Sequence, residues 1–355
     1  MKIVLVTDAA PPQVNGVVIT LTTLTRELLL LGHDVRTISP AMFRTVPCPT
    51  YPEIRLAVFP HGGVRAAIEH AQPDAVHIAT EGPLGMAARR ICLALGLRFT
   101  SAYHTRFPEY LRARAPVPLW LSYAWLRRFH GAAVRVMVPT ASMQTELALR
   151  RIVNTVVWPR GVDTARFTPD GPRAFTSRKP VFMYVGRVAV EKNIEAFLDL
   201  DLPGEKWVVG GGPQLASLQR RYPAVHFAGP KAHHELAAWY RSADVFMFPS
   251  RTDTFGLVLL EALACGVPVA AYPVPGPNDV IGRAGAGALD EDLWSAAMRA
   301  LQIDCAVARR HALAFSWQHV AGQFVSYLAP QTPAAEAVLV AERDLSARAI
   351  SRVQP

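Results

Sequence analysis

Short apolar runs alternate with helical patterns along most of the chain, and this alternation restricts the possible folds more than any other feature of the sequence. In the first half, strands are expected at residues 3–6, 35–38, 54–59, 74–78, 99–103, 134–138 and 155–158, with helices at 18–31, 64–71 and 84–95. In the second half, strands are expected at residues 181–185, 207–209, 225–227, 245–248 and 267–271, with helices at 191–200 and 234–241. Because strands that alternate with helices form parallel βαβ units, the sequence predicts an α/β protein with two Rossmann-like halves.

A polar segment rich in proline and glycine separates the two halves. It covers residues 169–180 and is predicted to link an N-terminal domain, residues 1–168, to a C-terminal domain, residues 181–316. A chain of 355 residues is long enough for two such domains. Since ligands bind at the carboxyl ends of the strands in sheets of this kind, the loops that follow the strands are the candidate site.

Charge and cysteine content narrow the possible partners and compartment. The net charge is +9, carried mainly by arginine, which suits nucleic acid, an anionic membrane or a phosphate-bearing substrate. No nucleic-acid-binding motif accompanies this charge, so nucleic acid is not an expected partner. The four cysteines are scattered without a CxxC pair, which predicts reduced thiols. The first residues do not resemble a signal peptide, and no window of about 18 uncharged apolar residues is found, so any membrane contact is expected to be peripheral.

The stretch 250–268 is predicted to be a polar loop that leads into a buried helix. Cap-type residues, including Asp253, precede an apolar run that ends at a glycine and a proline. Glu261 is the single charge in this run, and a buried carboxylate needs hydrogen-bond donors from the protein or from the hydroxyls of a ligand. The N–H groups near Phe255 and Gly256 begin the helix, and they suit a phosphate.

Two cations and a glycine-rich turn follow other strands of the same half. Arg187 comes directly after one strand, Lys192 opens the next helix, and Gly210 begins the turn after the following strand. Alone, the two cations are typical of a solvated surface. Together with the turn and the helix N-terminus, they indicate a diphosphate site at one edge of the sheet. The turn lacks the GxGxxG pattern of dinucleotide oxidoreductases, since the third glycine position falls on Leu215.

Taken together, these motifs resemble those of the family-4 glycosyltransferases of the GT-B fold, and the resemblance covers nearly the whole chain. The motifs that carry it are Gly186-Arg187 with Lys192, residues 209–213, residues 245–250, the acid–seven–acid pattern from Asp253 to Glu261, Gly161-Val162-Asp163 and Phe315-Ser316-Trp317. The resemblance implies two Rossmann-like domains that face a central cleft. It also implies that residues 317–328 form a helix that crosses back to the N-terminal domain, and that residues 329–355 form a C-terminal tail.

The resemblance implies a role for each of these residues. Arg187 and Lys192 would hold the donor diphosphate and offset the charge that builds on the leaving group. Asp253 would contact hydroxyls of the donor sugar, and Glu261 would accept hydrogen bonds from the ribose. His104 would lie across the cleft near the transferred sugar and would complete a catalytic set with Arg187, Lys192 and Asp253. Further donor contacts are expected at Gly16, Gly186, Gly210, Lys231, Phe255, Gly256 and Leu257.

The resemblance also implies the type of reaction. The family transfers sugars with retention of anomeric configuration, and the leaving phosphate is thought to help deprotonate the acceptor. No protein base is therefore assigned, and neither a cofactor nor a metal is expected. Asp253 stands where the family more often has Glu, which resembles the subset of GDP-mannose-dependent mannosyltransferases and sulfoquinovosyl- or glucuronosyl-diacylglycerol synthases. The expected donor is GDP-mannose, a UDP-hexose or a UDP-hexuronate.

Aromatic and basic residues are interleaved over residues 110–135, a composition that suits an anionic membrane surface. A core helix with solvated arginines has the same composition. The membrane interpretation predicts a lipid acceptor such as diacylglycerol and a peripheral location at the cytoplasmic face of the cell membrane; a soluble or polysaccharide acceptor is the alternative. Two further classes are a nucleotide-sugar epimerase, for which no acid–base pair is found, and a non-catalytic nucleotide-sugar-binding protein.

Overall fold

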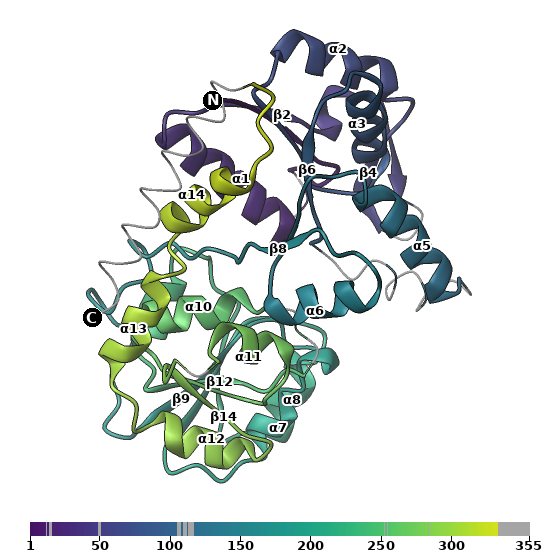
Figure 1. Cartoon of the computed structure of the whole chain (residues 1–355). Helices are drawn as coiled ribbons and strands as arrows, with labels where there is room; N and C mark the ends of the chain where they lie inside the picture. Colours follow the sequence, from purple (N-terminus) through teal and green to yellow (C-terminus); the bar gives the residue numbers. More distant parts are fainter. Residues whose placement is uncertain are drawn as a thin grey trace. The chain divides into compact units, whose positions relative to one another are not determined.

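The computed structural model describes residues 1–11, 13, 16–48, 51–104, 108, 112, 117–251, 253, 255–282 and 284–332, with the backbone alone at 51–53. The chain divides into two compact units (Figure 1). The first comprises residues 1–159 and the chain from Gln318 onward, and the second comprises Arg160–Trp317. The second unit thus begins at Arg160, before the segment that was predicted to be the linker, residues 169–180. Within the second unit, the side chain of Arg241 donates hydrogen bonds to the carbonyls of Thr168 and Pro172.

The first unit is built on a six-stranded parallel sheet. Its strands lie in the order β2 (Asp34–Ile38), β1 (Lys2–Val6), β5 (Ala75–Ile78), β6 (Phe99–Ala102), β7 (Val136–Val138) and β8 (Thr155–Val157). The chain leaves β1 toward β2 on one side and reaches β5 on the other. Strands β1 and β5 therefore form the switch point of this sheet, where the loops diverge and a ligand can enter.

Helices cover both faces of the first sheet. One face carries α2 (His61–Ala71), α3 (Pro83–Ala94), α5 (Leu119–His130) and α6 (Ala141–Leu149), which share one apolar core with the strands. The other face carries α1 (Gly16–Leu30) and the part of α14 (Trp317–Tyr327) that belongs to this unit (Figure 1). There the ring of His77 lies edge-on to Phe324, with the ring centroids 4.9 Å apart.

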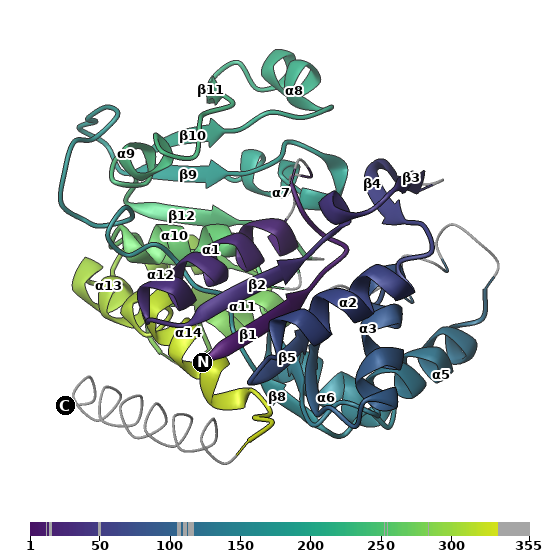
Figure 2. The same ribbon diagram turned by 90° about the horizontal axis from the view of Figure 1, so that it is seen from above.

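The second unit contains a parallel sheet of six strands as well. Their order is β11 (His226–Gly229), β10 (Glu205–Val209), β9 (Val181–Val185), β12 (Val245–Phe248), β13 (Val269–Ala271) and β14 (Gly287–Leu289). Figure 2 shows β11, β10, β9 and β12 side by side. This is the Rossmann strand order, with its switch point between β9 and β12. The predicted α/β fold with two Rossmann-like domains is confirmed.

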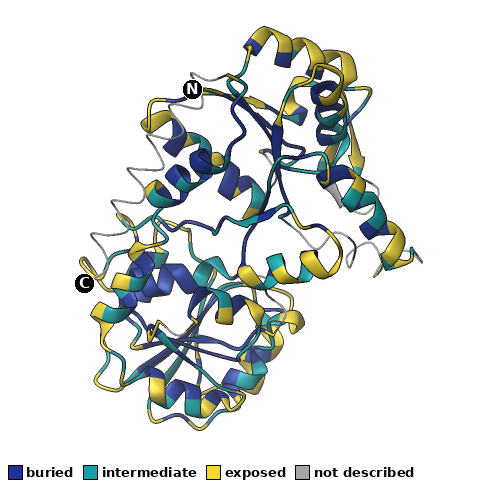
Figure 3. Cartoon of the chain, in the orientation of Figure 1, coloured by how far each residue is buried: buried dark blue, intermediate teal, exposed yellow. Residues whose placement is uncertain are grey.

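Alternation along β9 explains why both faces of the second sheet are covered. Val181, Met183 and Val185 enter one apolar core, while Phe182 and Tyr184 enter another on the opposite face. The first core is closed by α9 (Leu236–Tyr240), α10 (Leu257–Ala264), α11 (Pro275–Val280) and α13 (Cys305–Leu313). The second is closed by α7 (Glu195–Leu198), α8 (Leu215–Arg221) and α12 (Leu293–Ala300). Figure 3 shows that α10 is buried along most of its length, as its apolar sequence predicts.

Two expectations about local structure are wrong. The run at 54–59 does not join the parallel sheet; it overlaps β4 (Tyr51–Ala57), which pairs antiparallel with β3 (Thr45–Cys48) in a separate two-stranded sheet. The helix expected at 191–200 is split into a 3-10 turn, η2 (Val190–Lys192), and α7. Asn193 lies between them with a left-handed φ of 52°. A further 3-10 turn is η1 (Pro40–Met42). No helix in the described part of the chain is both long and apolar enough to cross a membrane.

Candidate functional site

An ion pair joins the two loops at the switch point of the second sheet. Lys192 lies in the connection after β9 and Asp253 in the loop after β12, and Lys192 Nζ is 2.6 Å from Asp253 Oδ1. Asn193 ties the same two loops, since its Nδ2 donates to the carbonyl of Pro249 at 3.1 Å. The sequence predicted both charged residues at the donor site but not the bond between them.

The second carboxylate oxygen of Asp253 differs from the first in its surroundings. Asp253 Oδ2 is buried and accepts no hydrogen bond from the described residues. Leaving a buried charged acceptor unpaired disfavours folding by roughly 1–3 kcal/mol or more, so such an atom indicates a missing partner. The hydroxyl group of a ligand is a partner of the right kind, and a sugar carries several.

The backbone of the loop after β10 requires glycine. Gly210 has a φ of 145°, which residues with a side chain rarely adopt, and a Cβ at this position would overlap the carbonyl oxygen of Gly186. The two loops are joined by hydrogen bonds from the N–H of Gly186 to the carbonyl of Val209 at 3.0 Å and from the N–H of Val188 to the carbonyl of Gly211 at 2.9 Å. Gly186 and Gly210 therefore set how closely the β9 and β10 loops approach.

Arg187 projects from the β9 loop into solvent. Its side chain is 67% exposed, and its Nη1 lies 3.9 Å from Glu191 Oε1, a surface contact worth little in free energy. The backbone beneath it is fixed, because the hydroxyl of Tyr184 donates to the carbonyl of Arg187 at 2.8 Å. Burial raises the pKa of Tyr184 far above its ordinary value, so this hydroxyl keeps its proton. Arg187 thus combines a fixed backbone with an exposed cationic side chain.

Glu261 lies within α10 and is held by two protein groups that the sequence did not reveal. His233 Nε2 donates to Glu261 Oε1 at 3.0 Å, and the hydroxyl of Tyr240 donates to Oε2 at 2.9 Å. Of the two sources of donors that the sequence left open, the protein therefore supplies two donors. Each oxygen keeps a further acceptor position, so the contact with a ribose stays a prediction. Hydrogen bonding to Glu261 raises the pKa of His233, and burial raises that of Tyr240.

The start of α10 presents its backbone, not side chains, to the site. Gly256 caps the helix with a φ of 81°, and Leu257 is the first helical residue. The ring of Phe255 is buried in the apolar core, so Phe255 can contact a ligand only through its backbone. Gly276 in α11 lies against this loop, since a Cβ there would be 2.7 Å from the carbonyl oxygen of Asp253. The N–H of Leu259 donates to the carbonyl of Gly256 at 2.9 Å, so the N–H groups of Leu257 and Val258, which precede it in the first turn, are the ones that suit an anion.

The remaining predicted site residues lie in two places. Lys231 follows β11, with its Nζ 5.0 Å from the centre of the Trp239 ring, a cation–π contact in the second unit. Gly16 and His104 belong to the first unit: Gly16 begins α1, and His104 follows β6 with its ring edge-on to Trp158, the ring centroids 6.3 Å apart. In the described part of the chain, no three His, Cys, Asp or Glu side chains are grouped to hold a metal ion.

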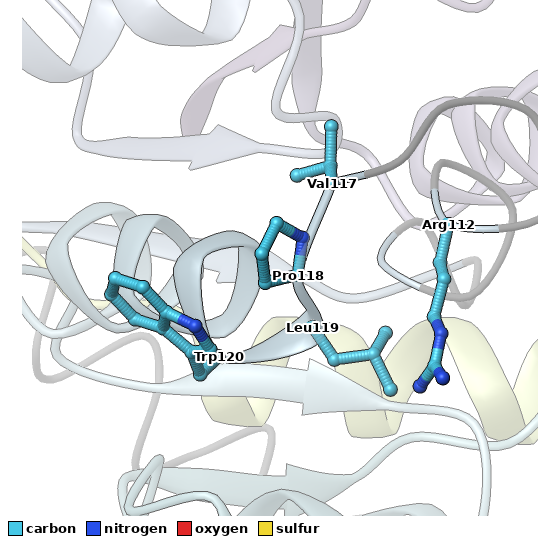
Figure 4. Close-up of a pocket in the computed structure, with 5 residues that line it drawn as sticks. All are labelled: Arg112, Val117, Pro118, Leu119 and Trp120. Carbon is cyan, nitrogen blue, oxygen red and sulfur yellow. The ribbon is translucent and has the colours of Figure 1, made fainter.

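The predicted membrane segment, residues 110–135, is partly core and partly surface. Tyr123, Leu126 and Phe129 are buried under the first sheet, as the core-helix interpretation requires. Trp120 is 68% exposed and Leu121 49%. Figure 4 shows a pocket of about 550 Å³ lined by Arg112, Val117, Pro118, Leu119 and Trp120. Residues 110, 111 and 113–116 lie outside the described residues.

Comparison with known proteins covers both units. The model of a family described as Glycosyltransferase Family 4 matches residues 14–166, and the model of Glycosyl transferases group 1 matches residues 179–304. The computed structure also superposes on the sucrose-phosphate synthase of Thermosynechococcus elongatus with a TM-score of 0.67 at 21% identity, over 91% of this chain and 96% of that one. This likeness concerns the fold.

Three curated relatives have similar sequences. A GDP-mannose-dependent alpha-mannosyltransferase of Mycobacterium tuberculosis is 29% identical over 79% of this chain and 81% of its own length. A sulfoquinovosyl transferase of Arabidopsis thaliana is 31% identical over 67% of this chain and 50% of its own length. An alpha-monoglucosyldiacylglycerol synthase of Streptococcus pneumoniae is 29% identical over 85% of this chain and 78% of its own length.

Proposed function

Because the chain belongs to the family-4 glycosyltransferases of the GT-B fold, we propose that it is a retaining hexosyltransferase that uses a nucleotide sugar and acts on a membrane lipid. The donor is GDP-mannose or a UDP-linked hexose or hexuronate, and the acceptor is a lipid such as diacylglycerol. The names of the relatives support this choice, since one is GDP-mannose-dependent and another is a diacylglycerol glycoside synthase. The observation that carries the proposal is the Lys192–Asp253 pair at the β9–β12 switch point, with Asp253 Oδ2 buried and without a donor among the described residues.

Each group at this edge has a chemical task in the proposed reaction. Lys192 and Arg187 bind the diphosphate and stabilise the negative charge that develops on it as the glycosidic bond breaks. Asp253 Oδ2 accepts a hydrogen bond from a hydroxyl of the sugar. The first-turn N–H groups of α10 contact the sugar or the phosphates. Glu261, already oriented by His233 and Tyr240, accepts the ribose hydroxyls.

The proposed chemistry needs no basic side chain. The bond between the anomeric carbon and the diphosphate oxygen breaks, and the acceptor oxygen bonds to the same face of that carbon. The acceptor's proton passes to an oxygen of the departing diphosphate. His104, in the first unit, contributes contacts to the transferred sugar. Charge stabilisation at Lys192 and Arg187 therefore becomes the main protein contribution to the rate.

The surface of α5 supports a lipid acceptor. Trp120 and Leu121 are exposed at the start of α5, and Arg128 is exposed near its end. Trp120 and the exposed cation Arg112 both line the pocket in Figure 4. Aromatic and basic residues together suit the interface of an anionic membrane. We assign this surface to peripheral contact with the cytoplasmic face of the membrane. Arg127 and Arg135 are less exposed and contact backbone carbonyls within the first unit.

A screen of donors against membrane lipids tests the function. The purified protein is incubated with GDP-mannose, UDP-glucose or UDP-glucuronate and vesicles of mixed lipids, and products are detected by mass spectrometry. A lipid that gains one hexosyl or hexuronosyl unit is the expected result. Modification of soluble glycans alone would favour the soluble-acceptor alternative, and failure to float with anionic liposomes would contradict the membrane assignment.

A further inference from the structure

The switch point of the first sheet also carries two carboxylates. Asp8 lies just beyond β1 and Glu81 just beyond β5, and these two strands are paired in parallel. Their carboxyl ends therefore meet at the same edge, which is where ligands enter sheets of this type. Burial is the main cause that raises the pKa of Asp8, and the charge of Glu81 adds to it.

The carboxylate of Asp8 has a structural role. Its carboxylate accepts hydrogen bonds from the hydroxyl of Thr80 at 2.8 Å and from the N–H of Leu84 at 2.9 Å, and so caps the start of α3. A Cβ on Gly82 would lie 2.5 Å from the carboxyl carbon, so the loop is closed tightly over it. Burial raises the pKa of Asp8 despite these bonds. Asp8 is thus a structural cap.

Glu81, unlike Asp8, is held by a single hydrogen-bond donor among the described residues, the buried side chain of His130. His130 Nε2 donates to Glu81 Oε1 at 3.2 Å, and Ser101 Oγ lies 2.9 Å from His130 Nδ1. Since a carboxylate can only accept, Nε2 is the donor in the bond to Glu81, and the serine hydroxyl holds the other ring nitrogen. Ser101 and His130 are completely buried, whereas the Glu81 side chain is 18% exposed. Glu81 Oε2 accepts no hydrogen bond from the described part of the chain.

The order serine–histidine–carboxylate resembles a hydrolytic triad, but the burial excludes that role. A nucleophilic serine must be reached by its substrate, and Ser101 is 0% exposed in the middle of β6. Of these three side chains, Glu81 is the exposed one and therefore the one that a ligand can contact. Two buried polar side chains behind it restrict its orientation, which lowers the entropy lost when it binds a partner.

We propose that Glu81 binds the acceptor, with its Oε2 accepting a hydrogen bond from an acceptor hydroxyl, and that His130 and Ser101 are positioning residues. The site rests on the proposed function, because it needs a glycosyl acceptor. Its ligand chemistry is a hydroxyl on a polyol, glycerol or sugar group. His104 follows β6, the strand next to β5, so the residue expected near the transferred sugar leaves the same edge of the sheet. Glu81 orients the hydroxyl, and the departing diphosphate takes the proton.

Steady-state kinetics of Glu81→Gln and Glu81→Ala test this role. The donor is whichever of GDP-mannose and UDP-glucose the wild-type protein uses, and the acceptor is dioleoylglycerol in phosphatidylglycerol vesicles. Both variants should raise the acceptor KM about 10- to 100-fold, the effect of losing one hydrogen bond to a charged group. Donor KM and hydrolysis of the donor without acceptor should stay within about twofold, because neither uses this group.

Control variants separate binding from folding. Glu69→Gln removes a 46% exposed glutamate paired with Arg65 on α2 and should change no parameter. Ser101→Ala should raise the acceptor KM less than Glu81→Gln, with donor KM unchanged, as expected for a positioning residue. Glu81→Gln keeps the size of the side chain, so it remains informative if Glu81→Ala fails to fold.

The outcomes distinguish the two proposals. Absence of any transfer by the wild-type protein contradicts the function, and the acceptor role with it. Wild-type transfer with an unchanged acceptor KM in Glu81→Gln contradicts the role of Glu81 alone. Equal increases of donor and acceptor KM in that variant would also overturn it, since they indicate a general structural effect.

Discussion

Lys192 Nζ lies 2.6 Å from Asp253 Oδ1, and this ion pair links the connection after β9 to the loop after β12 although the two residues are 61 positions apart. The lysine offsets the charge of the aspartate, while the other carboxylate oxygen, Oδ2, accepts no hydrogen bond from the residues that the structure describes. A nucleotide sugar would give both groups better partners, with phosphate oxygens for the lysine and a sugar hydroxyl for the aspartate.

Removal of the lysine charge should slow transfer strongly. Lys192→Ala should lower kcat/KM for the donor about 100- to 1,000-fold, the range seen when one preorganised donor to a developing negative charge is lost. Arg187→Ala should have a smaller effect, because its side chain is mostly solvated. Lys179→Ala, a change in the exposed segment before β9, is the control and should leave activity unchanged. Unchanged kinetics in Lys192→Ala and Arg187→Ala would contradict the site.

Substitution of Asp253 should separate sugar binding from nucleotide binding. Asp253→Asn keeps the shape of the side chain but removes its charge, so transfer should fall about 10- to 100-fold through lost charge-assisted hydrogen bonding. Calorimetric binding of GDP or UDP, which lack the sugar, should weaken by less than about threefold. If nucleotide and nucleotide sugar lose affinity equally, Asp253 does not contact the sugar.

Two neighbouring glycines give a matched test of the β9–β10 loop packing. Gly210→Ala should reduce the free energy of unfolding by about 2 kcal/mol or more, because of its positive φ and the overlap with the carbonyl of Gly186. Gly211→Ala should be nearly neutral, since a Cβ there meets Pro230 at an ordinary 3.5 Å. Denaturant titration measures both. Equal stability of the two variants would contradict the packing described.

Stability should depend on pH through His233. Its hydrogen bond to Glu261 raises its pKa above the ordinary 6.5, while Arg166 opposes and Asp163 supports the shift. A group with a raised folded-state pKa contributes stability that is fully present below its unfolded pKa and is lost as pH rises through the folded pKa. The destabilisation caused by His233→Gln should therefore be largest below the ordinary histidine pKa of 6.5 and should decrease as the pH is raised from there into the alkaline range. Thermal melting across this range measures it, and a pH-independent difference would contradict the assignment.

Five of the six strands of the second sheet were predicted, because their signals are local, whereas β14 was missed. The runs that form β9 and β12 are short, apolar and bounded by polar or glycine residues, and both were placed with the observed bounds. The break at Asn193 also had a local signal, since asparagine tolerates the left-handed region, but the apolar residues around it favoured a continuous helix. The run that became β4 carries no information about which strand it pairs with.

The partners within the site were not predictable, because they depend on strand order. Lys192 meets Asp253 since β9 and β12 are neighbours. Glu261 meets Tyr240 of α9, and His233 just before α9, since α9 contacts α10. Glu81 lies after a strand that the sequence identified, yet its link to His130 spans 49 residues. The residue types indicated which side chains could take part in binding or catalysis, and the order of the strands determined which of these side chains come into contact.

The stereochemistry of the product tests the central claim most directly. A donor with an α-linked sugar is converted by the wild-type protein, the glycolipid is isolated, and the anomeric configuration of the new linkage is read from its one-bond C–H coupling by nuclear magnetic resonance. Retaining transfer predicts an α-linked hexosyl group on the acceptor. A β-linked product, or a nucleotide sugar that is consumed without any sugar reaching an acceptor, would contradict it.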